Sequence, residues 1–388
     1  MNIRESAAQA RGAAIELAAT AGEVKNRALA QIADALRKNA AAIVAANRQD
    51  LERAQAQNLA PPLLKRLRFD EAKIAESCTG LQSLMALPDP VGHTLAATEL
   101  DDGLELYKLS CPIGVIGVIF ESRPDALVQI SALCLKSGNA VLLKGGHEAA
   151  QTNRILARLI KDAGERSGVA NGWLALMQSR ADVTEMLALE SDIDLIIPRG
   201  SNAFVRYIME NTAIPVLGHA DGICHLYIDR AAGLEMAVAV AVDSKCQYVA
   251  VCNAVETILV HAALADTVLP SLRWALAAKG VEIRGCEKTR RHIDVLPADE
   301  SDWRSEYLDY IVSIRVVETL EAATTHINHY GSGHTDVIVT ADRHRARRFL
   351  DRIDSACAFW NCSSRFSDGF RFGLGAEVGI STSKIHAR

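Results

Sequence analysis

The chain is poor in aromatic residues, has no excess of basic residues and contains no long uncharged apolar run. Aromatic side chains make up 5% of its 388 residues, which leaves little material for stacking nucleic-acid bases. Acidic residues number 47 against 42 basic ones, and the resulting net charge of −5 indicates no general nucleic-acid footprint. Because no run of about 18 apolar residues occurs, no transmembrane helix is expected. Neither nucleic acid nor a membrane is therefore an expected partner.

Cysteine pairs with the spacing of metal or redox motifs are also missing. The nine cysteines are an odd number spread from Cys78 to Cys362, and none belongs to a CxxC motif, a distribution typical of free thiols in a reducing compartment. His326, His329 and His334 are metal-ligand types, but no nearby cysteine or carboxylate completes a set, so no metal is expected. The N-terminus lacks the basic-then-apolar order of a secretory signal, which makes the cytoplasm the expected location.

What the sequence does contain is a regular alternation of helix and strand patterns. Its length is about two to three times that of a usual domain, so at least two packed units are expected. The first ninety residues carry apolar side chains at helical spacing, and a helix–strand alternation follows. The predicted strands are 113–120, 140–143, 193–197, 256–260, 310–317 and 336–340, and the predicted helices are 125–136, 148–163 and 202–210. This pattern predicts an α/β fold with parallel sheets in two lobes.

A short segment between the helical region and the first strand differs from both. It follows a proline-rich break at 88–92 and contains a turn-like Asp101–Asp102–Gly103 sequence. The residues after the turn, 104–109, alternate between apolar and polar. This combination predicts a β-hairpin.

Cys252 is the strongest candidate nucleophile. It stands where an irregular segment meets the apolar strand 256–260, and a thiolate at such a junction can face a cleft. Asn253 and the neighbouring amides favour this interpretation only slightly. A buried structural cysteine is the alternative, since most intracellular cysteines are of that kind.

Two turns between a strand and a helix have the composition of nucleotide-binding loops. The strand 140–143 runs into Lys144, Gly145, Gly146 and His147 before a helix opens, so a phosphate or ribose could approach the backbone there. A solvated lysine in a glycine turn is the alternative. The strand 193–197 ends similarly before Gly200 and Ser201. The glycines of 373–379 imitate a dinucleotide fingerprint only loosely, because no strand–helix context surrounds them.

Together these segments resemble the gamma-glutamyl phosphate reductase family, also called glutamate-5-semialdehyde dehydrogenases, a divergent branch of the aldehyde dehydrogenase superfamily. The similarity runs along nearly the whole chain. It is carried by 112–124, 135–146, 198–204, 215–225, 251–254, 317–338 and 372–377. So many matches in the right order make a chance similarity implausible.

The resemblance implies an aldehyde-dehydrogenase-like α/β fold with a defined domain order. Residues 1–98 and 111–230 would form a Rossmann-like cofactor domain, 99–110 an oligomerisation hairpin, and 231–362 the catalytic domain. Residues 363–388 would return toward the active site, with the last strand of the oligomerisation sheet missing. A homo-oligomer is implied where that strand is present.

The resemblance also implies a reaction. Cys252 would displace phosphate from L-glutamate 5-phosphate, and NADPH would reduce the resulting thioester to the semialdehyde, the second step of proline biosynthesis. Asn253 and Ser122 would assist Cys252 in catalysis, and Arg123, Glu121, Gly375 and Glu377 would lie near the substrate. Glutamate 5-kinase is the implied candidate partner.

For the cofactor, the resemblance assigns the adenosine ribose to Lys144 and the nicotinamide ribose to Glu306. His147 occupies a position that is often acidic in NAD-preferring relatives, so NADP is expected. The full expected set at the cofactor is Lys144, Gly146, His147, Gly200, Ser201 and Glu306.

Two departures from the family pattern leave alternatives open. Tyr248 and Val249 replace an Arg–Pro pair usual before the nucleophile, which keeps a non-catalytic nucleotide-binding paralogue in consideration. A hydrolytic semialdehyde dehydrogenase is the other alternative. Against it, the stretch 217–222 lacks the glutamate that activates water in hydrolytic aldehyde dehydrogenases.

Overall fold

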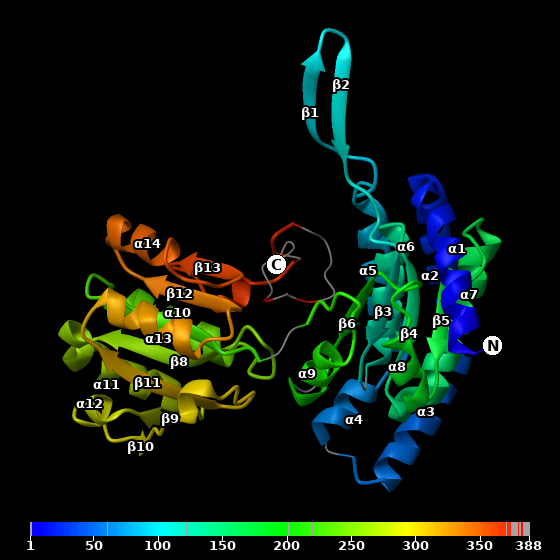
Figure 1. Ribbon diagram of the computed structural model, residues 1–388. Helices are drawn as coiled ribbons and strands as arrows, with labels where there is room; N and C mark the ends of the chain where they lie inside the picture. The colour runs from blue at the N-terminus through cyan, green and yellow to red at the C-terminus, as the bar shows by residue number, and fades with distance from the viewer. Residues whose placement is uncertain are drawn as a thin grey trace. The chain divides into compact units, whose positions relative to one another are not determined.

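The computed structural model of the chain describes residues 2–59, 61–121, 123–200, 202–218, 221–369, 371–373, 379 and 382 (Figure 1). Its contacts divide the chain into two compact units, Met1–Gly218 and His219–Arg388. None of the helices formed by these residues combines the length and apolarity needed to cross a membrane.

The first unit begins with helices, as the sequence predicts. They are α1 (Ile3–Ala18), α2 (Gly22–Lys38), α3 (Ala40–Ala56), α4 (Pro61–Leu67) and α5 (Glu71–Ala86). The start of α1 is fixed by a capping box in which the Asn2 side chain accepts from the backbone N–H of Glu5 and the Glu5 carboxylate accepts from that of Asn2. The Asp70 side chain caps α5 in the same position.

A parallel sheet forms the centre of the first unit. Among the described residues its strands are β3 (Val115–Ile119), β4 (Ala140–Lys144), β5 (Leu174–Met177) and β6 (Leu195–Pro198), in the order β5-β4-β3-β6. The connecting helices are α6 (Pro124–Lys136), α7 (Ala150–Arg166) and α8 (Arg180–Met186), and α9 (Asn202–Glu210) follows β6. All residues of β3 and β4 are buried, which explains their continuous apolar sequences. The strand order reverses between β3 and β6, where α/β sheets bind nucleotides at the carboxyl edge.

The predicted hairpin is present and longer than expected. Strand β1 (Thr94–Asp101) pairs antiparallel with β2 (Leu104–Leu109), so the hairpin begins before the predicted boundary at residue 99. Gly103 closes the turn with φ of 72°, a conformation that favours glycine. Every residue of both strands is exposed in this chain, including Leu106 and Tyr107.

The second unit is built on a larger parallel sheet. Within the part of the chain that the structure describes, its strand order is β10-β9-β11-β8-β7-β12-β13 (Figure 1). The strands are β7 (Cys224–Ile228), β8 (Val255–His261), β9 (Glu282–Gly285), β10 (Leu296–Pro297), β11 (Ile311–Val317), β12 (Thr335–Val339) and β13 (Cys357–Trp360). The helices are α10 (Leu234–Cys246), α11 (Ala265–Ala277), α12 (Glu287–Arg290), α13 (Leu320–Tyr330) and α14 (Arg343–Leu350).

Alternate residues of the central strands bury two separate apolar faces. Leu226, Ile258 and Val337 pack in one cluster with residues of α10 and α11. Their neighbours Tyr227 and Leu259 pack in the other cluster with residues of α13 and α14. Helices therefore cover both sides of the sheet, as the period of two along each strand requires.

Strand β7 corrects one predicted boundary. The sequence places 111–230 in the first lobe, but β7 pairs with β8 on one side and β12 on the other, in the sheet of the second unit. Because these backbone hydrogen bonds fix the strand there, the division between the units falls at Gly218 and His219.

Truncation of a buried β7 side chain should destabilise the second unit. Leu226 is fully buried, so Leu226→Ala should cost about 2–5 kcal/mol through lost burial and the cavity left behind. The matched change Leu296→Ala, on the exposed edge strand β10 of the same sheet, should stay within about 0.5 kcal/mol. Hydrogen exchange of the β8 amides measures both, and equal effects would contradict the placement of β7.

Candidate active site

Cys252 lies in the turn between α10 and β8 and is partly exposed. The backbone of Gly222, just before the neighbouring strand β7, presses against this turn. A Cβ atom on Gly222 would come within 2.1 Å of the Cys252 carbonyl oxygen and 2.5 Å of its Cα. Since real Cβ atoms do not approach backbone so closely, only glycine permits this contact. The thiol is thus carried on a turn whose position is set by two adjacent strands.

Glu306 reaches the same place from the loop before β11. Its carboxylate accepts a hydrogen bond from the backbone of Gly222. Burial raises the pKa of Glu306, and the negative charge of Asp221 adds to this effect, while the Gly222 hydrogen bond and Lys245 act against it. Gly222 therefore contacts both Cys252 and Glu306, two residues that are 54 positions apart in the sequence.

A buried ion pair connects the Cys252 turn with the loop that carries Glu306. Lys245, in the last turn of α10, donates to Glu256 of β8 at 2.6 Å, and both side chains are fully buried. The second oxygen of Glu256 accepts the backbone N–H of Leu308 at 3.4 Å. Burial raises the pKa of Glu256 to about 7, although Lys245 pulls it down. The pair thus connects the two ends of the Cys252 turn with the loop that carries Glu306.

Cys224 contacts the backbone of Cys252, and His334 packs against Cys224. The Cys224 thiol donates to the Cys252 carbonyl oxygen at 3.1 Å and lies 3.7 Å from Nδ1 of His334. Burial raises the pKa of Cys224 well above that of a free thiol, so this cysteine is a structural donor. His334 in turn lies 2.7 Å from the hydroxyl of Thr335.

The chain after β13 returns to the Cys252 turn and is hydrogen-bonded to it. Ser364 Oγ donates to the carbonyl of Asn253 at 2.6 Å, and Asn253 Nδ2 donates to the carbonyl of Ser367 at 2.8 Å. The backbone N–H of Ser364 also donates to Ser244 of α10 at 3.1 Å. The Asn253 side chain is buried and joins the turn to the returning chain.

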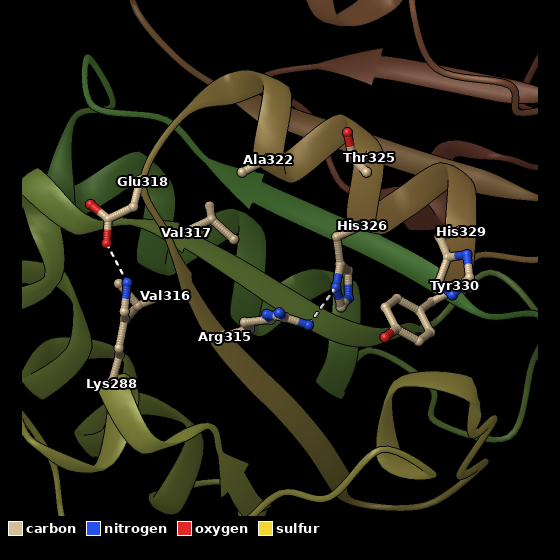
Figure 2. A pocket seen from close by; sticks show the side chains of 10 residues that line it. All are labelled: Lys288, Arg315, Val316, Val317, Glu318, Ala322, Thr325, His326, His329 and Tyr330. Carbon is tan, nitrogen blue, oxygen red and sulfur yellow. Dashed lines mark hydrogen bonds and ion pairs between the residues drawn. The ribbon is translucent and has the colours of Figure 1, made fainter.

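A pocket of about 470 Å³ lies elsewhere in the second unit, between β11 and α13 (Figure 2). It contains His326 and His329 but neither Cys252 nor Glu306. Arg315 donates to Nδ1 of His326 at 3.1 Å, and Lys288 pairs with Glu318 (Figure 2). Burial and nearby positive charges lower the pKa of His326 to about 2, so it accepts the guanidinium hydrogen bond as a neutral ring. His326 and His329 line this pocket, whereas His334 does not.

In the first unit, the predicted cofactor loop follows β4. Lys144 is the last residue of the strand, is buried, and donates from Nζ to the carbonyl of Gly145 at 2.5 Å. Gly146 precedes a short 3-10 turn, His147–Ala149. The His147 side chain is 73% exposed and its Nδ1 lies 3.3 Å from Oε2 of Glu148. The imidazole is therefore free to face a ligand from solvent.

Helix α3 holds this loop in place. Asp50 is fully buried and accepts from the backbone N–H groups of Gln151 and Thr152 at 3.2 and 2.8 Å. Arg53 donates to the carbonyls of His147 and Glu148 at 3.1 and 3.3 Å. The start of α7 is thus capped by a side chain from another helix, a contact that no local sequence pattern could reveal.

Glu121 and Gly200 meet at the carboxyl edge where the strand order reverses. A Cβ atom on Gly200 would lie 3.0 Å from Oε1 of Glu121. Burial and the charge of Glu148 raise the pKa of Glu121, and Arg66 lowers it. Arg123, by contrast, is exposed and pairs with Asp125 at 2.9 Å. The predicted residues Ser122, Ser201, Gly375 and Glu377 lie outside the described residues.

Comparison with known proteins shows the family to which the chain belongs. The model of the aldehyde dehydrogenase family matches residues 1–283. Gamma-glutamyl phosphate reductase of Pelotomaculum thermopropionicum is 62% identical over 388 residues, which cover 100% of this chain and 89% of that protein. The crystal structure of gamma-glutamyl phosphate reductase from Thermotoga maritima is 38% identical with a TM-score of 0.98, over 100% of this chain and 94% of that one. The chain belongs to the gamma-glutamyl phosphate reductase family.

Membership in this family makes the chain an oxidoreductase of the aldehyde dehydrogenase type. More distantly, an engineered glycolyl-CoA reductase with bound NADP+ shares the fold, at 17% identity and a TM-score of 0.66 over 98% of this chain and 91% of that one. The predicted aldehyde-dehydrogenase-like α/β fold is therefore confirmed. Members of this superfamily use a nicotinamide cofactor, which agrees with the nucleotide-binding topology of the first unit.

Adding one methyl group at Gly222 should displace the nucleophile. Gly222→Ala forces the Cys252 backbone to move, and a shift of about 1 Å at a reacting group costs roughly 100-fold in rate. Gly12→Ala, in α1, adds the same group where nothing lies within 4 Å and should leave turnover unchanged. The rate of Cys252 alkylation and the turnover number measure the effect. Unchanged values for Gly222→Ala would contradict the contact.

Proposed function

We propose that the chain catalyses the NADPH-dependent reduction of L-glutamate 5-phosphate to L-glutamate 5-semialdehyde and phosphate, the second step of proline biosynthesis. The observation that carries this proposal is the contact of Gly222 with two residues. Its backbone packs against that of the partly exposed Cys252 and donates a hydrogen bond to the carboxylate of Glu306. The name and high identity of the relatives supply the substrate.

The proposed chemistry is displacement followed by reduction at Cys252. The thiolate attacks the acyl carbon, the bond between that carbon and the phosphate oxygen breaks, and inorganic phosphate leaves with the electron pair. The product is a thioester on Cys252, and its developing oxyanion needs a donor such as the Cys252 backbone N–H. Bound NADPH supplies the hydride that reduces the thioester carbon. The carbon–sulfur bond of the thiohemiacetal then breaks, which releases the semialdehyde and regenerates the thiolate.

The residues at the carboxyl edge of the first sheet fit a dinucleotide. Gly146 follows β4 and Gly200 follows β6 at the carboxyl edge of the sheet, where doubly wound folds bind the phosphates of a dinucleotide. Lys144 would hold the adenosine ribose beside them. In the second unit, Glu306 would hold the nicotinamide ribose through its carboxylate, which the hydrogen bond from Gly222 orients.

The absence of a water-activating glutamate favours reduction over hydrolysis. The sequence 217–222 contains no glutamate. An enzyme that forms an acyl intermediate for reduction gains nothing from a base that activates water, because water would hydrolyse that intermediate.

We also propose that the hairpin β1–β2 mediates association into a homo-oligomer. Six large apolar side chains of its strands are between 53 and 60% exposed, which is unusual for a surface that remains in water. They are Leu95, Leu100, Leu104, Leu106, Tyr107 and Leu109. A second copy of the chain would cover them.

The decisive assay runs the reaction in reverse. Wild-type protein with glutamate 5-semialdehyde and NADP should form NADPH only when inorganic phosphate is present, because phosphate is the acyl acceptor. Cys252→Ser should abolish turnover and leave NADPH binding within about two-fold, since serine is a far poorer nucleophile near neutral pH. Absorbance of NADPH and fluorescence titration measure the two properties.

Each alternative function predicts a different result in this assay. Turnover that does not depend on phosphate would indicate a hydrolytic semialdehyde dehydrogenase. If Cys252→Ala changed no measurable property, the chain would be a non-catalytic nucleotide-binding paralogue.

We propose that His147 contributes to a preference for NADP. A carboxylate one residue further along, Glu148, already lies beside the loop, but its side chain is only 11% exposed whereas His147 is open to solvent. His147→Asp should lower the ratio of kcat/KM for NADP over NAD by roughly 10-fold, because the new charge would repel the 2′-phosphate. Glu148→Gln is the matched variant and should move the ratio in the opposite direction. A ratio that His147→Asp leaves unchanged would remove His147 from the ribose site.

A further inference from the structure

Two arginines on the C-terminal segment have no carboxylate partner among the described residues. Arg365 is half-buried in the short turn Ser364–Phe366, and its guanidinium makes one hydrogen bond, to the neutral amide of Gln247 at 3.2 Å. The guanidinium of Arg371 lies over the ring of Phe366 at 4.9 Å. Among other arginines of this unit, Arg284 and Arg345 pair with carboxylates, whereas Arg304 and Arg315 bond to histidines. Arg365 makes no direct ion pair with a described carboxylate, and a bound anion would compensate the charge of this half-buried guanidinium.

Arg365 lies close enough to Cys252 for the charges of the two side chains to interact. Burial and the neighbouring Arg371 lower the pKa of Arg365, whereas the negative charges of Asp368, Cys252 and Asp243 raise it. Gln247, its hydrogen-bond partner, lies five residues before Cys252 in the same connection between α10 and β8. The residue before it, Ser364, is bonded to the carbonyl of Asn253. Arg365 is therefore held beside the Cys252 turn by contacts on both sides of the thiol.

The Cys252 turn itself carries no cation. Residues 247–254 contain neither lysine nor arginine. A phosphoryl group that must lie against the thiol during acyl transfer therefore needs a positive charge from another segment. Guanidinium groups are well suited, because their paired N–H donors match two phosphate oxygens at once.

We propose that Arg365, assisted by Arg371, binds the phosphoryl group of the acyl phosphate beside Cys252. This inference rests on the proposed function. In the reductive direction the guanidinium stabilises the phosphate as it leaves with the electron pair of the broken carbon–oxygen bond. In the reverse direction the same site holds inorganic phosphate for attack on the thioester. The C-terminal segment is then part of the substrate site and not only a support for the turn.

The test compares phosphate affinity in full-length variants. In the reverse assay, Arg365→Gln should raise the KM for inorganic phosphate roughly 10- to 100-fold, the value of one lost charge-assisted hydrogen-bond pair. Arg371→Gln should raise it less, because Arg371 is more exposed. The KM for NADP should stay within about two-fold. Arg291→Gln, which removes an exposed arginine paired with Glu287 on α12, is the matched control and should change nothing.

A second measurement does not depend on turnover. Inorganic phosphate should protect Cys252 of the wild type from alkylation by iodoacetamide, and Arg365→Gln should lose that protection. Arg365→Lys keeps the charge and should retain part of it, which guards against a variant that merely fails to fold. Without phosphate, Arg365→Gln should be alkylated more slowly than the wild type, because a nearby cation favours the thiolate, so protection is taken in each variant as the ratio of the rates with and without phosphate.

Two results would overturn the inference. One is an unchanged phosphate KM together with unchanged protection in Arg365→Gln. The other is a slower alkylation rate without phosphate and an unchanged phosphate KM, which would mean that Arg365 acts on the thiol alone. If the wild type shows no phosphate-dependent turnover, the proposed function fails, and the protection experiment still decides whether Arg365 binds phosphate.

Discussion

The buried ion pair between Lys245 and Glu256 connects the parts of the molecule that the chemistry requires. One partner lies in the last turn of α10, the other is the second residue of β8, and between them the chain makes the turn that carries Cys252. Through Leu308 the same glutamate reaches the loop of Glu306. Burying two charges costs several kcal/mol for each ion unless the geometry and the remaining hydrogen bonds are good. Here the ion pair fixes the position of two loops. Apolar side chains could fill the same space, but they could not bond to both loops at once.

Gly222 and the C-terminal segment complete this arrangement from two other directions. Gly222 lies against the Cys252 backbone and donates to Glu306, while Ser364 and Asn253 join the returning chain to the same turn. Each of these contacts involves a backbone group, so each restricts the position of the turn. A nucleophile held this way has little conformational freedom to lose when a substrate binds.

Much of the fold was predictable because its signals are local. The apolar runs at 113–120 and 140–143 became the buried strands β3 and β4, and the helix predicted at 202–210 is α9 with the same bounds. Strands β5, β9, β10 and β13 were missed, because segments of two to four residues carry too little periodicity to be distinguished from loops. The five-residue strand β7 was missed as well. The boundary after residue 230 was wrong for a different reason: the membership of β7 in a sheet depends on partners more than 25 residues away.

The candidate site likewise has features that follow from the local sequence and features that follow from tertiary contacts. The sequence by itself determined the chemical groups, namely a cysteine before an apolar strand and a lysine with two glycines after another, because these groups are adjacent in the chain. Only the tertiary structure decided that Gly222 must lack a side chain, that Asp50 caps α7, and that Arg365 lies beside the Cys252 turn. These depend on distances between segments that are between 30 and about 115 residues apart, and such distances are set by packing and not by any local pattern.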